Sequence, residues 1–141
     1  MQKNRLFTAA LCVTLTFSLP VRAACSDDAS LLALRTRMMV SALSCGGKSD
    51  YNTIVRKHRY SLLAAQRGVA GSMATGGVSA YDGWVTELAN QLGLFRAEAG
   101  DNYCPAALKE LHEVAHLKNA AALRVMSDKL RAPYPAIEGC N

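Results

Sequence analysis

The chain has 141 residues, half of them hydrophobic and 19% charged, and a formal net charge of +5. This composition is typical of a folded globular protein and argues against a disordered chain. Much of the positive charge belongs to Lys3, Arg5 and Arg22; the residues after position 23 carry 13 basic and 11 acidic side chains, a net charge of +2. Such a small excess gives no support for a nucleic-acid partner.

The first 23 residues have the pattern of a secretory signal peptide. A charged start precedes an apolar run from Leu6 to Leu19, and small residues lead to Ala23. The run has 14 residues, fewer than the roughly 20 that span a bilayer. We therefore expect cleavage after Ala23, a periplasmic or secreted protein, and no transmembrane segment in the mature chain. A lipoprotein with a lipidated Cys25 is the alternative.

Residues 24–141 should form one helical domain with four amphipathic helices in succession. The first begins at Ser26 and ends before Gly46, and the second begins near Ser49 and ends in a glycine-rich stretch from Gly68. The third, over 79–99, has the clearest apolar spacing and places Phe95 inward. The fourth covers about 105–131, with a break at Lys118–Asn119 as an alternative. Four such helices with short connections predict an antiparallel four-helix bundle.

The cysteines indicate how that bundle is cross-linked. Once Cys12 leaves with the signal peptide, an exported chain retains four cysteines, which suits two disulfides. The bundle order favours the pairs Cys25–Cys140 and Cys45–Cys104. Pairing Cys25 with Cys45 is disfavoured, because a helix between them separates its ends by roughly 28 Å, whereas a disulfide allows about 6 Å between Cα atoms. A zinc site of four thiolates is the alternative, but the chain lacks a close Cys-x-x-Cys pair.

The segment HEVAH, residues 112–116, resembles the zinc-binding motif of the zincin metallopeptidases. The resemblance implies that His112 and His116 bind zinc and that Glu113 acts as the general base. It covers these five positions only. The competing interpretation places both histidines on the flank of the helix's apolar stripe and Glu113 towards solvent.

A third histidine lies at a comparable level of the predicted bundle. His58 occupies a position between Ile54 and Leu62 on the apolar side of the second helix. Three neutral imidazoles from His58, His112 and His116 would suit zinc, copper or nickel. Around His58, the basic run from Arg56 to Arg59 could contact an anionic partner, although the helical turn disperses its members.

Together these patterns predict an exported helical binding protein without catalytic activity, with no cofactor and with a protein or small ligand as partner. The alternative is a zinc-dependent hydrolase or a metal-binding protein that uses HEVAH, with Glu113 as the catalytic residue and zinc as the cofactor.

Overall fold

The computed structural model describes residues 21–73, 76–130 and 135–137, the first four of these as backbone only. The described residues form six α-helices and one short 3-10 helix, without any strand. The all-α class expected from the sequence is thereby confirmed. Within these same ranges, no helix is long and apolar enough to cross a membrane. Most of the predicted signal peptide lies outside the described residues, so its assignment stays a prediction.

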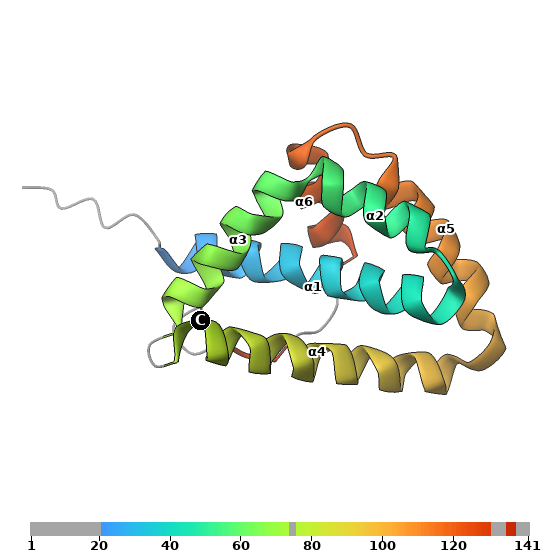
Figure 1. The fold of residues 1–141 in the computed structure, drawn as a ribbon, viewed down its shortest axis with the longest axis horizontal. Helices are drawn as coiled ribbons and strands as arrows, with labels where there is room; N and C mark the ends of the chain where they lie inside the picture. The colour runs from blue at the N-terminus through green and yellow to red at the C-terminus, as the bar shows by residue number, and fades with distance from the viewer. Residues whose placement is uncertain (1–20, 74–75, 131–134, 138–141) are drawn as a thin grey trace, which may run out of the picture.

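Helix α1 (Val21–Cys45) lies at the centre and contacts each of the other five α-helices (Figure 1). Its side chains are buried without interruption from Ala29 to Leu34, and again at Thr36, Met38, Ser41 and Ala42. The Thr36 hydroxyl is satisfied within the helix, since it donates to the carbonyl oxygen of Leu32 at 2.9 Å. A helix that is buried around its circumference serves as a core element rather than as one face of a bundle.

The other helices surround α1 in chain order. Two short helices joined at His58 form an arch over one side of α1, and a long helix runs below it in Figure 1. Two further short helices, joined by a loop, pack on the remaining side. Their bounds are α2 (Lys48–Lys57), α3 (Arg59–Ser72), α4 (Gly77–Ala99), the 3-10 helix η1 (Gly100–Asn102), α5 (Tyr103–Ala115) and α6 (Ala120–Lys129).

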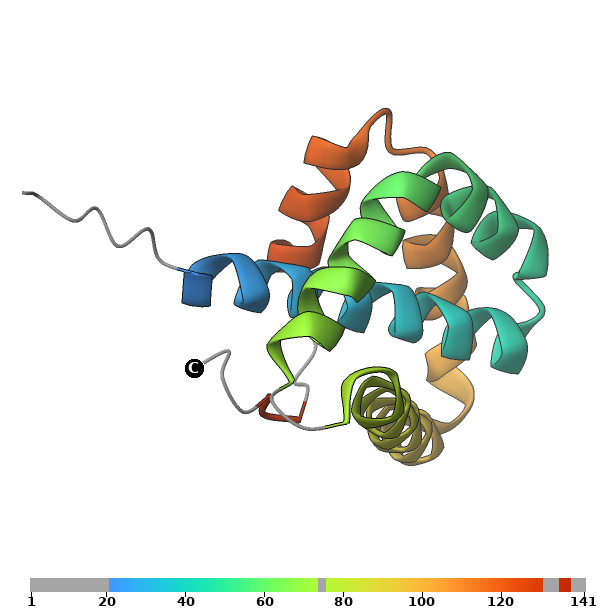
Figure 2. The same cartoon turned by 60° about the vertical axis from the view of Figure 1, so that its left-hand side comes forward.

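The antiparallel four-helix bundle is not confirmed. The second predicted helix divides at His58, and the fourth divides between Ala115 and Ala120, close to the break considered at Lys118–Asn119. Helices in a four-helix bundle lie nearly parallel or antiparallel. In Figure 2, by contrast, α4 is seen almost along its axis while α1 still runs across the picture, so these two helices cross.

The crossing limits how much of α4 is buried. Its inward side chains are Tyr81, Trp84, Leu88 and Leu92, as the apolar spacing predicts. Phe95, which the same spacing places inward, is 58% exposed. The expectation for Phe95 is wrong because the buried stretch of α4 ends one turn earlier, at Leu92.

One of the two predicted disulfides lies within the described residues. Cys45 at the end of α1 is bonded to Cys104 in the first turn of α5, with 5.3 Å between their Cα atoms. The two residues are 59 positions apart, and the chain-entropy model assigns about 4 kcal/mol to closing a loop of that length. For the other predicted pair, Cys25 is buried, whereas Cys140 lies outside the described residues.

A short stretch near the C-terminus returns to the core. The indole Nε1 of Trp84 donates to the carbonyl oxygen of Pro135 at 2.9 Å. Ile137 is 4% exposed and belongs to the same apolar cluster as Cys25. Residues 135–137 therefore pack against α4 and the core.

Candidate functional site

The three histidines occupy two different kinds of environment. His58, between α2 and α3, is 3% exposed and lies between the buried side chains of Ile54 and Leu62. Its position on the apolar side is therefore as the sequence predicts. Burial, and to a smaller extent the charge of Lys57, lowers the pKa of His58, so the ring is neutral near pH 7. Its Nε2 is buried and has no hydrogen-bond partner among the described residues.

His112 and His116 are exposed at the end of α5. Their rings lie 4.1 Å apart between centroids, and the Nδ1 atom of His112 lies 3.3 Å from Oδ2 of Asp50 in α2. His116 stands where α5 ends, and its Nδ1 donates to the carbonyl oxygen of His112 at 2.8 Å. Glu113 is exposed as well, in agreement with the prediction that it faces solvent.

The geometry does not assemble the predicted metal ligands. In the part of the chain that the structure describes, no group of three or more His, Cys, Asp or Glu side chains is arranged to hold a metal ion. His58 is thus not brought together with His112 and His116 in such a group. A zincin site requires a third protein ligand beside the two histidines, and none of the described acids completes one around HEVAH.

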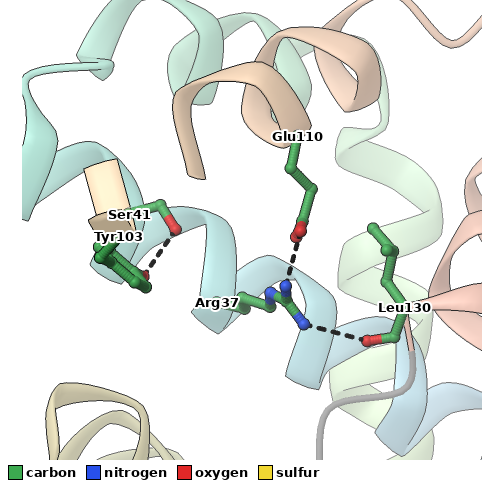
Figure 3. Close-up of polar contacts among 5 residues, drawn as sticks. All are labelled: Arg37, Ser41, Tyr103, Glu110 and Leu130. Atoms are coloured by element: carbon green, nitrogen blue, oxygen red, sulfur yellow. Dashed lines mark hydrogen bonds and ion pairs between the residues drawn. The ribbon is translucent and has the colours of Figure 1, made fainter. Parts of the chain in front are cut away.

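A partly buried charged pair joins α1 to α5, and its arginine also reaches the end of α6 (Figure 3). Arg37 Nη2 donates to Oε2 of Glu110 at 2.6 Å, and Arg37 Nη1 donates to the carbonyl oxygen of Leu130 at 3.3 Å. Leu130 caps the C-terminus of α6, where a cation is favoured by the helix dipole. One turn along α1, the hydroxyls of Ser41 and Tyr103 are hydrogen-bonded at 3.0 Å.

Glu110 is an unusual member of this pair. Burial raises the pKa of its carboxyl group, and the nearby Arg37 lowers it by less. The Oε1 atom is buried and lacks a hydrogen-bond partner in the described ranges, so only one of the two carboxylate oxygens is satisfied. Keeping Glu110 ionised in the folded protein therefore costs free energy.

A second charged contact lies nearer the start of α1. Arg124 of α6 donates to Oδ1 of Asp28 at 3.0 Å, with 42% and 19% of the two side chains exposed. Both pairs link the central helix to the last two helices. Among the described residues, neither contact belongs to a group of three or more side chains that could hold a metal ion, so we interpret both as contacts that orient helices.

An open groove lies between α1 and the arch, and it is the candidate binding site. Its volume is about 320 Å³, at the lower end of the range typical of ligand pockets. Its walls combine apolar side chains with two arginines and no acid: Arg35, Val55, Arg59, Leu62, Leu63 and Gln66. Arg35 also faces Tyr81 of α4, whose pKa is raised by burial and lowered in part by the charge and hydrogen bond of Arg35.

The sequence alone did not identify this groove. Arg35 interrupts the buried run of α1 directly after Leu34. A charged residue within an apolar run is a sequence signal for a site that reaches the surface. The other walls come from α2 and α3, and their placement depends on the break at His58. Comparisons of the chain with protein-family models, curated proteins and solved structures gave no match.

We expect Glu110→Gln to change how stability depends on pH. Because the folded-state pKa of Glu110 is raised, the folded protein binds this proton more tightly than the unfolded chain does. The contribution of Glu110 is thus fully present below its ordinary pKa of 4.5 and is lost as pH rises through the folded value. Urea unfolding of wild type and variant between pH 4 and pH 7 measures the difference.

The stability of the wild type relative to Glu110→Gln should fall as pH rises through this window. Glu98→Gln, at an exposed position of α4, is the matched control and should follow the wild-type curve. Parallel curves for wild type and Glu110→Gln, or a relative gain of the wild type with rising pH, would contradict the assignment.

Proposed function

We propose that this protein is an exported binding protein, without catalytic activity, that recognises an acidic segment of a protein partner through the α2–α3 arch, residues 48–72. The observation that carries the proposal is the groove, where Arg35 and Arg59 flank an apolar wall. A partner carrying a carboxylate beside an apolar side chain would satisfy both features.

The charge of the arch supports an acidic partner. It contains five basic residues, Lys48, Arg56, Lys57, Arg59 and Arg67, and one acid, Asp50. Asp50 is directed towards His112 at the α5 side, so it does not offset the basic residues around the groove. Complementary charge of this kind speeds encounter and selects among partners.

The rim of the groove carries side chains typical of protein interfaces. Leu63 in its wall is 38% exposed. Next to the groove, the Arg59 guanidinium carbon lies 5.8 Å from the ring centre of Tyr60, which is 82% exposed but does not line the groove. Tyrosine and arginine are the residue types that most often dominate binding energy at interfaces. On its other side, α3 buries Leu62, Ala65 and Val69 in the core, which gives the rim a fixed base.

Export is supported by two independent features. The charged start and apolar run of residues 1–23 fit a signal peptide, and the Cys45–Cys104 disulfide suits an oxidising compartment. For the metallopeptidase alternative, the arrangement around His112 and His116 supplies no third ligand among the described side chains. The geometry of the described residues therefore supports a binding site at the groove better than it supports a metal site at HEVAH.

Photo-crosslinking tests where the partner binds. A benzoylphenylalanine introduced at Leu63 in intact exporting cells should crosslink to one partner, and the captured segment, mapped by mass spectrometry, should be acidic. The yield should fall when Arg59→Gln is added, because the paired cation is lost. The control position is Val125 on α6, which is 69% exposed and distant from the arch in sequence.

Equal crosslinking from positions 63 and 125 would contradict the proposed interface. A captured segment without acidic residues, or a yield that does not respond to Arg59→Gln, would contradict the proposed chemistry of recognition.

We also expect the second disulfide, Cys25–Cys140, in the exported protein. Cys25 is buried in the same apolar cluster as Ile137, three residues before Cys140. Non-reducing tryptic digestion should give a peptide from Ala24 to Arg35 bonded to one from Ala132 to Asn141. Its N-terminus would also locate the cleavage site.

The outcome of this digestion is unambiguous. A Cys25 peptide bonded to any other cysteine would refute the pairing, and one that carries an acyl group would establish the lipoprotein alternative. A peptide that begins elsewhere than Ala24 would correct the predicted cleavage.

A further inference from the structure

A second cleft lies between the bend of the arch and the loop that joins α5 to α6. Both segments lie near the top of Figure 1. It has a volume of about 140 Å³, and its walls come from both sides: Lys57, His58, Tyr60, Ser61, Lys118, Asn119 and Ala120. It is separate from the groove, and it shares none of the groove's lining residues.

The charges around this cleft all have one sign. Lys57 at the end of α2 and Lys118 in the α5–α6 loop line it from opposite elements, and none of the lining residues is acidic. Tyr60 and Ser61 add two hydroxyl groups, which can donate to an oxyanion.

The start of α6 adds backbone donors. Asn119 caps this helix, because its Oδ1 accepts from the backbone N–H of Ala122 at 2.9 Å. The N–H groups of the two preceding residues, Ala120 and Ala121, have no acceptor within the helix itself. N–H groups at a helix start, together with the helix dipole, favour an anion.

An independent observation points to a ligand here. His58 lines the cleft, is 3% exposed, and has a buried Nε2 atom with no hydrogen-bond partner among the described residues. Buried polar atoms in native proteins are nearly always paired. In the tautomer that carries the proton on Nε2, the neutral ring would donate a hydrogen bond to an anion oxygen that reached this atom.

We propose that this cleft binds a phosphate group, as inorganic phosphate or as a phosphate monoester, between Lys57, Lys118, His58 and the N-terminus of α6. A tetrahedral oxyanion suits the site because the donors come from both sides of the cleft. The proposal is independent of the acidic protein partner, since Arg35, Arg59 and Leu63 take no part in it.

NMR titration of the purified mature protein tests the site at constant ionic strength. With inorganic phosphate, the His58 ring and the Ala120 amide should shift together with one saturable dissociation constant. Lys118→Gln should weaken binding by at least about fivefold, since it removes a charge-assisted hydrogen bond. Lys129→Gln, at the far end of α6, is the matched control and should bind as the wild type does.

Glycerol phosphate in a parallel titration distinguishes the two ligand sources. Saturable binding of the monoester assigns the site to a phosphate group on a larger molecule, and binding of inorganic phosphate alone assigns it to the free ion; either result supports the site. A shift that chloride reproduces, the absence of saturation with both phosphates, or equal affinity in Lys118→Gln would overturn the proposal.

His58→Leu supplies a second test through stability. Leucine removes the unpaired nitrogen, so the phosphate-free variant should be at least as resistant to urea as the wild type. Added phosphate should then stabilise the wild type more than the variant, which retains the other donors of the site. Equal stabilisation of both proteins would overturn the role of His58.

Discussion

The burial of α1 on all sides is the constraint on which the rest of the structure depends. Every other α-helix contacts it, and an uninterrupted run of its side chains from Ala29 to Leu34 is buried. Burying this much apolar surface is the main source of folding free energy. Because each outer helix packs on the same central element, the positions of the groove and the cleft are set relative to one another through α1.

Polar groups on α1 give these contacts direction, which apolar packing alone does not provide. Arg37 fixes both Glu110 of α5 and the end of α6, and Asp28 pairs with Arg124 of α6. The Cys45–Cys104 disulfide then joins the end of α1 to the start of α5. These contacts fix α5 and α6 against α1. The arch packs one face on the core and exposes the other to solvent, as an interface requires.

The sequence predicts the elements well and their arrangement poorly. Helical spacing and the helix ends next to Gly46 and Gly100 follow from local rules. The Cys45–Cys104 pair follows from placing the end of the first helix beside the start of the helix at Cys104, which holds although the four-helix bundle is not confirmed. The break at His58 does not follow from local rules, because Ile54, His58 and Leu62 keep a four-residue spacing that a straight helix would share. Polar residues within α1 likewise give its sequence the pattern of a surface helix, although α1 is the central helix of the fold. The groove is lined by residues from three helices, so no continuous sequence motif predicts it. HEVAH, in contrast, is a continuous motif, but the described residues do not supply the third metal ligand that it requires.

The most direct measurement is the affinity of the partner segment mapped by crosslinking, made as a labelled peptide and titrated by fluorescence anisotropy. Arg59→Gln should weaken binding about tenfold, the effect of one charge-assisted contact. Arg67→Gln removes an equal charge from α3 outside the groove and should change the affinity less than about twofold, as expected for a screened surface charge. Equal losses in the two variants would show that net charge alone governs binding and would contradict recognition by the groove.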